Sequence, residues 1–108
     1  MSQNPRTKLG RKKGTRDHYL LRLFVVGLGP NSKLALSNLQ SLCCEHLEGR
    51  YTIEVIDVVK NYQAAARDNI LITPALVLVT PLPRVVVLGN LSDRQRVLFA
   101  LRLSGGDP

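Results

Sequence analysis

The spacing of apolar residues along the chain predicts a domain in which strands and helices alternate. Residues 19–26 (YLLRLFVV) are almost continuously apolar and residues 51–59 (YTIEVIDVV) are rich in β-branched side chains, as is typical of strands. Between these strands, apolar residues recur every three or four positions, which predicts an amphipathic helix. Strand, helix and strand joined by short connections form a βαβ unit, so we expect the two strands to be parallel neighbours.

The connections at the two ends of this first helix carry residues that suit helix termini. Asn31 and Ser32 follow Pro30 and are good N-caps, and Gly49 is a natural C-terminal stop. We therefore expect the helix to begin near Asn31 and to end before Gly49. Its apolar stripe consists of Ala35, Leu36, Leu39, Leu42, Cys43, His46 and Leu47.

The second half of the chain begins with a short helix followed by two short strands. Residues 61–69 (NYQAAARDN) combine an alanine run with an asparagine cap, which predicts the helix. Residues 75–79 and 85–88 are apolar and predict two strands. Because only the proline-containing turn at 80–83 separates these strands, we expect them to pair antiparallel.

A final helix is expected to begin with Ser92 as its N-cap, because Gln95 stands at the capping-box distance, and to end at residues 104–106 (SGG). The order βαβ-α-ββ-α fits a thioredoxin-like α/β fold, in which a mixed four-stranded sheet has helices on both faces. In that arrangement a Thr-Pro pair before the third strand is commonly a cis peptide, so we predict that Thr73–Pro74 is cis. The buried stripe of the final helix is expected to contain Val97, Leu98, Leu101 and Leu103.

Positive charge is concentrated at the N-terminus rather than spread over the chain. The net charge is +7, and residues 1–16 hold six of the 15 basic residues and none of the 8 acidic ones. Residues 1–17 are therefore predicted to be a disordered basic tail, followed by a domain at 18–104 and a flexible end at 105–108. We interpret the tail as a solubilising extension; the alternative is an arm for nucleic acid or an acidic partner.

The chain lacks the residue patterns of the common catalytic and cofactor sites. The turn at 27–32 (GLGPNS) has serine where a dinucleotide loop needs its third glycine. Thioredoxins carry their reactive Cys-x-x-Cys at this junction, where this chain has no cysteine. Cys43 and Cys44 are adjacent and match neither a redox dithiol nor a metal knuckle, so at least one should pack in the core. We expect no catalytic residue, no cofactor and no metal, and a protein that works by binding.

The location of the protein can be inferred from what the chain does not contain. No apolar run approaches the ~20 residues needed to span a membrane, and the N-terminus lacks the order of a secretory signal. We therefore expect a cytoplasmic protein with no membrane partner, and nucleic acid is not an expected partner of the domain.

A zinc site is not expected either. His18 and His46 are the only histidines, which leaves too few ligands for one.

Several sequence blocks, in the same order and without a gap, resemble the KaiB family of circadian-clock proteins. The blocks are GLGPNSKLAL, YTIEVIDVVKN, ILITPALV, PLP and GNLSDRQRVL, and the resemblance covers about residues 19–103. It implies a protein that is not an enzyme and that binds the hexameric ATPase KaiC. It also implies further partners, a KaiA-like protein or a histidine kinase, in a circadian or clock-like timing system.

The resemblance further implies that the chain has two folds. In clock members, a tetrameric or dimeric ground state and a monomeric thioredoxin-like state share the N-terminal half and differ in the C-terminal half. By this resemblance, residues 60–103 are the switching half and the thioredoxin-like state is the one that binds the ATPase. The candidate residues for the switch are Thr73, Pro74, Pro81, Pro83, Ala100 and Arg102.

Two of these residues depart from clock members, which commonly carry glycine and aspartate where this chain has Ala100 and Arg102. Glycine within a helix costs about 1 kcal/mol relative to alanine. Arginine in the last helical turn suits the helix dipole by about 0.3–1 kcal/mol, whereas aspartate opposes it. We therefore hypothesise that this chain populates the thioredoxin-like form more readily than clock members do.

Other departures affect the surface that the resemblance assigns to partner binding. Asn69 stands where a lysine is usual, for example. An altered surface favours an alternative function, a thioredoxin-like adaptor in stress or two-component signalling without a rhythm. The candidate partner-binding residues are Lys60, Asn61, Arg67, Asn69 and Arg84.

Overall fold

The computed structural model describes residues 18–27 and 29–103. The predicted basic tail at 1–17 and the flexible end at 105–108 lie outside the described residues. The final helix ends at Ala100, earlier than the predicted stop at 104–106, because Leu101 is its C-cap and Arg102 has a left-handed backbone. The elements follow the predicted order βαβ-α-ββ-α. They are β1 (Tyr19–Val25), α1 (Pro30–His46), β2 (Tyr51–Asp57), α2 (Tyr62–Arg67), β3 (Ala75–Thr80), β4 (Val85–Leu88) and α3 (Arg94–Ala100).

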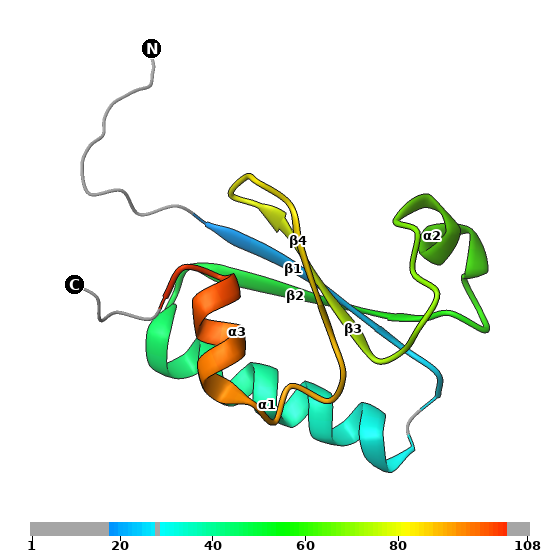
Figure 1. Cartoon of the computed structure of the whole chain (residues 1–108), viewed down its shortest axis with the longest axis horizontal. Helices are drawn as coiled ribbons and strands as arrows, with labels where there is room; N and C mark the ends of the chain where they lie inside the picture. Colours follow the sequence, from blue (N-terminus) through cyan, green and yellow to red (C-terminus); the bar gives the residue numbers. More distant parts are fainter. Residues whose placement is uncertain (1–17, 28, 104–108) are drawn as a thin grey trace.

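The four strands form one mixed sheet in the order β2-β1-β3-β4 (Figure 1). Strand β1 runs parallel to β2, as a βαβ unit requires, and antiparallel to β3. Strands β3 and β4 pair antiparallel across the proline turn, as the sequence predicts. The thioredoxin-like arrangement with a mixed four-stranded sheet is therefore confirmed.

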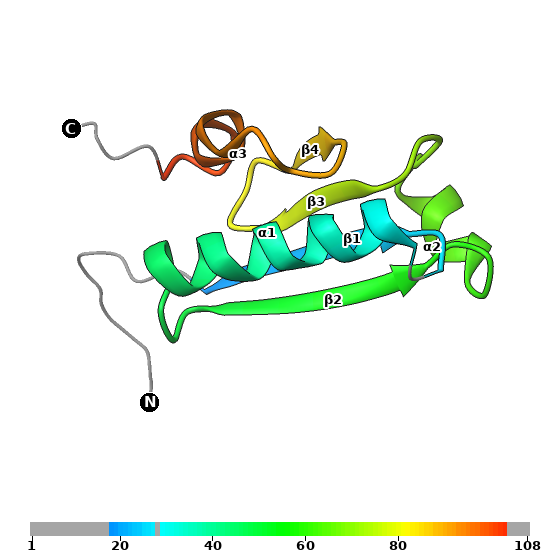
Figure 2. The ribbon, with the colours of Figure 1, turned by 90° about the horizontal axis from the view of Figure 1, so that it is seen from below.

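Helices cover the two faces of the sheet unequally. Helices α1 and α3 lie together on one face, and α2 lies apart from them at one end of the sheet, as the two views show (Figures 1 and 2). The larger core forms under α1 and α3 and includes Leu21 and Leu23 of β1. The smaller core forms on the opposite face, where Phe24, Val77 and Ala65 of α2 are buried together. Strand β1 thus has core contacts on both faces, which explains its almost continuous apolar sequence.

The N-cap of helix α1 lies two residues before Asn31, the first of the two predicted caps. This N-cap is Gly29, whose neighbour Pro30 is the first helical residue, and no side chain caps the helix. Proline suits this position because the first helical N–H groups have no partner within the helix. Asn31 is therefore not the N-cap. Ser32 is not the N-cap either: it is buried, and its hydroxyl donates a hydrogen bond to the carbonyl oxygen of Val26 at 3.4 Å.

The predicted stripe of α1 is correct except at His46. Ala35, Leu39, Leu42 and Cys43 are buried, but His46 is exposed. Leu47, the C-cap of the helix, is fully buried, so it occupies the inward position at this turn and His46 lies outside the stripe.

Helix α3 has a different N-cap from the one predicted. Asp93 is the cap, and its side chain accepts a hydrogen bond from the backbone N–H of Arg96. Ser92 lies one residue before the cap, so the capping-box prediction was wrong by one position, and aspartate is as good a cap as serine. Val97, Leu98 and Leu101 are buried, as predicted.

The loops next to the sheet contain three cis peptide bonds. Thr73–Pro74 is cis, as predicted for the residue pair that precedes β3. Thr80–Pro81 and Leu82–Pro83, in the turn between β3 and β4, are also cis.

Helices α2 and α3 both end in a left-handed residue that is not glycine. Asn69 has φ 57° and Arg102 has φ 59°. After α2, the N–H of Ile70 donates to the carbonyl of Ala65; after α3, the N–H of Leu103 donates to that of Leu98. This is the hydrogen-bond pattern of a Schellman motif. Arg102 therefore lies beyond the C-cap of α3. The prediction that it lies in the last helical turn was wrong.

Candidate partner-binding surface

The turn between β1 and α1, where thioredoxins hold their cysteines, carries no nucleophile among its described residues. Cys43 and Cys44 both lie in the fourth turn of α1, and Cys44 is exposed whereas Cys43 is buried. Burial, together with the nearby Cys44, raises the pKa of Cys43 to about 12, so its thiol stays protonated at neutral pH. In residues 18–27 and 29–103 no group of histidine, cysteine, aspartate or glutamate side chains is placed to hold a metal ion.

The connection from β2 into α2 is built by two polar residues. Asp57, the last residue of β2, accepts hydrogen bonds from Val59 on its side chain and from Lys60 on its carbonyl oxygen. This turn ends the strand two residues earlier than the apolar run predicted. Asn61 then caps α2, and its side-chain oxygen accepts a hydrogen bond from the N–H of Ala64 at 3.3 Å, as predicted.

The structure brings most of the predicted partner-binding residues to α2 and its ends. Lys60 lies in the turn before the helix, Asn61 is its N-cap and Arg67 is its last residue. Asn69 is the left-handed residue that ends it. Arg84 comes from the β3–β4 connection and donates a hydrogen bond from Nη2 to the carbonyl oxygen of Asp68, at 2.7 Å.

The predicted switch residues lie in three other places. Thr73 and Pro74 precede β3, and Pro81 and Pro83 lie in the turn between β3 and β4. Ala100 is the last residue of α3 and is partly buried against the larger core. Arg102 is exposed two residues further on, at the left-handed position. These residues do not form one site in this fold.

A polar hollow of about 200 Å³ lies between the sheet and α2. Two predicted residues, Asn61 and Arg67, contribute to it, but sequence reasoning missed the charged residues that form its floor. They carry a signal that could have been used: Arg22 and Glu54 are charges within apolar strands, and they are direct partners in the parallel register of β1 and β2. The lining consists of Arg22, Glu54, Ile56, Asn61, Ala64, Arg67 and Asp68.

Ion pairs connect the hollow to three elements. Arg22 Nε donates to Glu54 Oε1 at 2.8 Å, and Arg22 Nη1 lies 3.5 Å from Asp68 Oδ2. Arg84 Nη2 lies 3.7 Å from Asp68 Oδ1. The hydrogen bond to Glu54 is the main cause that raises the pKa of Arg22 above its ordinary value. We call Arg22, Glu54, Asp68 and Arg84 the α2 ion cluster.

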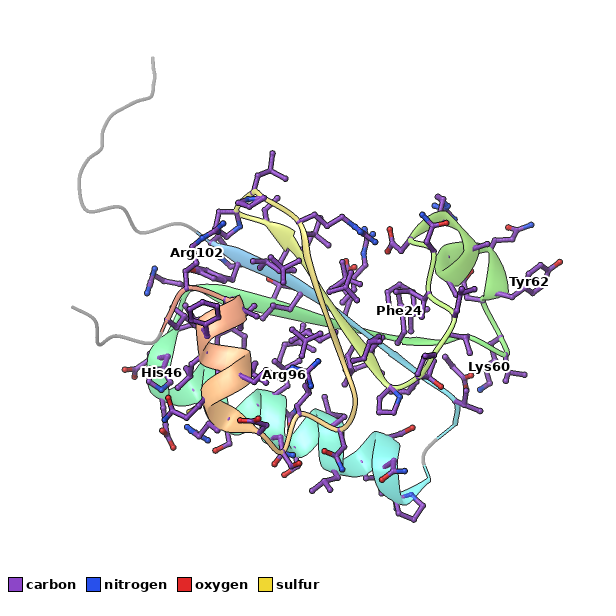
Figure 3. All side chains as sticks on the ribbon, viewed as in Figure 1. Phe24, His46, Lys60, Tyr62, Arg96 and Arg102 are labelled. Carbon is purple, nitrogen blue, oxygen red and sulfur yellow. The ribbon has the colours of Figure 1, made fainter. Side chains whose placement is uncertain are left out.

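Apolar side chains are unusually exposed in the first turn of α2 and on the two connections that flank it. Tyr62, in its first turn, is 69% exposed, and Leu71, in the loop that follows it, is 94% exposed. Figure 3 shows Tyr62 and Lys60 pointing outward at the α2 end of the molecule. We call these residues and their exposed neighbours the α2 surface; it consists of Val59, Lys60, Tyr62, Arg67, Leu71 and Ile72.

Comparison with known proteins identifies the family. A sequence model described as the KaiB domain matches residues 22–103. The chain belongs to the KaiB family. The circadian clock oscillator protein KaiB of Synechococcus elongatus is 46% identical over 92 residues, which cover 85% of this chain and 90% of that protein. KaiB of Microcystis aeruginosa is 47% identical over 85 residues, covering 79% of this chain and 82% of that protein.

Solved structures similar to this KaiB family member share its fold. The N-terminal domain of SasA from Synechococcus elongatus has a TM-score of 0.68 at 24% identity, covering 93% of this chain and 97% of that domain. Oxidised mitochondrial thioredoxin 3 of Saccharomyces cerevisiae has a TM-score of 0.64 at 15% identity, covering 81% of this chain and 80% of that protein. Among the described residues, no helix of this KaiB family member has the length and apolar character to cross a membrane.

Proposed function

We propose that this KaiB family member is a non-enzymatic regulator that binds a KaiC-type hexameric ATPase through the α2 surface. By binding, it modulates the activity or output of the ATPase in a circadian or clock-like timing system. Both relatives compared above are named as circadian clock oscillator proteins. The observation that carries the proposal is the α2 surface itself, where one short segment, residues 59–72, exposes both large apolar side chains and cations.

The chemistry of the α2 surface suits a protein partner. Apolar patches rimmed by polar residues mark interaction sites, and four of the six residues of the α2 surface are exposed apolar or aromatic side chains. Lys60 and Arg67 take part in no ion pair within residues 18–27 and 29–103, whereas the nearby Asp68 is paired with arginines. The partner is therefore expected to offer an apolar area with acidic groups at its edge.

The proposal includes a change of fold. The thioredoxin-like form is the binding form and is monomeric, and a tetrameric or dimeric ground state differs from it in residues 60–103. Thr73, Pro74, Pro81 and Pro83 lie on the connections that such a change would rearrange. A KaiA-like protein or a histidine kinase joins or competes for the bound form.

Size-exclusion chromatography of the full chain, alone and with purified cyanobacterial KaiC hexamer, tests this function. We expect the chain to elute with KaiC, and Tyr62→Ala to weaken the complex at least about tenfold, because exposed aromatic residues often dominate binding energy. Phe99→Ala is the matched control: Phe99 is 76% exposed but belongs to α3, far along the chain from the α2 surface. It should bind KaiC as the unmodified chain does.

The same experiment separates the proposal from its alternative. If the unmodified chain forms no complex with KaiC, the clock-type function fails and the adaptor in stress or two-component signalling gains support. If the complex forms but Phe99→Ala weakens it as much as Tyr62→Ala, the α2 surface is not the binding site.

A further inference from the structure

Helix α2 is held against the sheet by two sets of contacts, the smaller core at Ala65 and the α2 ion cluster. It is six residues long, and only Ala65 is buried. A helix of this length has no stability of its own in water, so its orientation depends on what it contacts. Its N-terminal end follows directly from the turn after β2, whereas its C-terminal end leads into the exposed loop at Leu71 and Ile72. The contacts of the C-terminal end therefore decide how the α2 surface is presented.

Those contacts converge on Asp68, the C-cap of α2. Its carbonyl oxygen accepts a hydrogen bond from Arg84, and its two carboxylate oxygens lie within ion-pair distance of Arg84 and Arg22. The Asp68 side chain is only 17% exposed. Within the described residues, Asp68 Oδ2 is buried and has no hydrogen-bond donor, so the nearby guanidinium of Arg22 is what compensates its charge. Removal of that compensation is costly for a carboxylate with so little access to water.

Arg22 is suited to this position because of its shape as well as its charge. It projects from β1, a strand paired on both sides, so its backbone is fixed by the sheet. Its planar guanidinium reaches Glu54 with Nε and Asp68 with Nη1 at the same time. A lysine ammonium is a single point charge and cannot direct two nitrogens to two carboxylates.

We propose that Arg22 is a positioning residue for the α2 surface: acting through Asp68, it holds the C-terminal end of α2 and the following loop against the sheet. This inference rests on the proposed function insofar as the α2 surface binds KaiC. The positioning itself is a property of the free protein, so it can be measured without a partner.

Native-state hydrogen exchange on the full chain tests the positioning, with amides 68–70 compared against amides of β1. We expect Arg22→Gln to raise exchange at 68–70 about tenfold while β1 amides change less than about twofold. Glu54→Gln is the matched control, because it removes the charge of the other partner of Arg22, which belongs to β2, and it should leave exchange at 68–70 nearly unchanged. Arg22→Lys should fall between the two.

A double variant shows whether Arg22 acts through Asp68. If it does, Arg22→Gln combined with Asp68→Asn should exchange no faster at 68–70 than Arg22→Gln alone, because no uncompensated carboxylate remains. Equal acceleration at 68–70 and in β1 would mean that Arg22 only stabilises the whole domain, and it would overturn the proposal, as would equal effects of Arg22→Gln and Glu54→Gln.

Binding to purified cyanobacterial KaiC provides the second measurement. We expect Arg22→Gln to weaken KaiC binding by several-fold although Arg22 lies outside the α2 surface, and Glu54→Gln to leave it unchanged. If the unmodified chain does not bind KaiC, the proposed function fails while the exchange result still decides the positioning. If KaiC binds both variants and the unmodified chain equally, Arg22 does not position the binding surface.

Discussion

Asn69, Leu91 and Arg102 hold positive φ angles that side chains other than glycine rarely adopt. Asparagine tolerates this region well, so Asn69 suits the end of α2 even though a lysine is usual there in clock members. Arginine has no such advantage. At Arg102 the favourable effect of a cation near the helix C-terminus is opposed by the backbone cost of the left-handed conformation, about 1–2 kcal/mol.

The bias toward the thioredoxin-like form that we hypothesised from Ala100 and Arg102 therefore depends on Ala100. Ala100 is within α3, where alanine favours the helix over glycine by about 1 kcal/mol. Arg102 is not, and replacing aspartate by arginine at a left-handed position brings a cost as well as a gain.

Substitution of these two residues by glycine should have opposite effects. Arg102→Gly should raise the free energy of unfolding by about 0.5–1 kcal/mol, because glycine adopts positive φ without strain. Ala100→Gly should lower it by about 1 kcal/mol, because it lies inside the helix. Urea denaturation followed by circular dichroism measures both. A loss of stability in Arg102→Gly would show that the arginine side chain contributes more than its backbone conformation costs.

At the scale of elements, sequence patterns located every helix and strand but were less accurate at helix ends. Local signals predicted these elements directly. They are the apolar stripes of α1 and α3 and the two apolar runs on either side of the proline turn. The predicted N-cap of α3 differs from the observed one because the neighbouring residues Ser92 and Asp93 are equally good caps. Which of them caps the helix depends on how the preceding loop packs. Here Leu91 is buried in that loop, which fixes where the helix can begin.

Two alanine substitutions distinguish the predicted cap of α3 from the observed one. Asp93→Ala should lower the free energy of unfolding by about 1 kcal/mol, because the N–H of Arg96 loses its acceptor. Ser92→Ala should change it by less than about 0.5 kcal/mol, since its exposed side chain does not cap the helix. Thermal and urea unfolding of the two variants, compared side by side, give the answer, and a larger effect at Ser92 would restore the capping box.

At the scale of the molecule, the two faces of the sheet differ in how much core they hold. The larger core lies under α1 and α3, and the smaller one depends on few side chains, of which Phe24 is the largest and is fully buried. Figure 3 shows Phe24 between the sheet and α2. The α2 ion cluster lies on this same face, so the polar and apolar supports of α2 are neighbours.

The two phenylalanines of the chain give a test of this core with an internal control. Phe24→Ala should lower the free energy of unfolding by about 3–5 kcal/mol, because it removes a fully buried ring and leaves a cavity beneath α2. Phe99→Ala should change it by less than about 0.5 kcal/mol, because that ring is mostly exposed. Calorimetric unfolding measures both, and similar effects of the two substitutions would contradict the burial described here.

The fold was more predictable than the site because the two depend on different distances along the sequence. Strand order, the mixed sheet and the cis Thr73–Pro74 peptide follow from local patterns and from the rules of βαβ connections. The α2 ion cluster joins Arg22, Glu54 and Asp68, which span 46 residues of the chain. No local sequence pattern predicts ion pairs between residues so far apart. Only the parallel register of β1 and β2 indicates it, and that register is known once the sheet has been assembled.

The order of the strands also determines what each segment of the chain finds when the protein is synthesised. The ribosome releases β1, α1 and β2 first, and these three can close on one another without any later residue. The other edge of β1 stays unpaired until β3 has been synthesised and pairs with it antiparallel. Strand β4 then pairs with β3. The C-terminal segments are therefore added to an existing template and never have to start a sheet of their own.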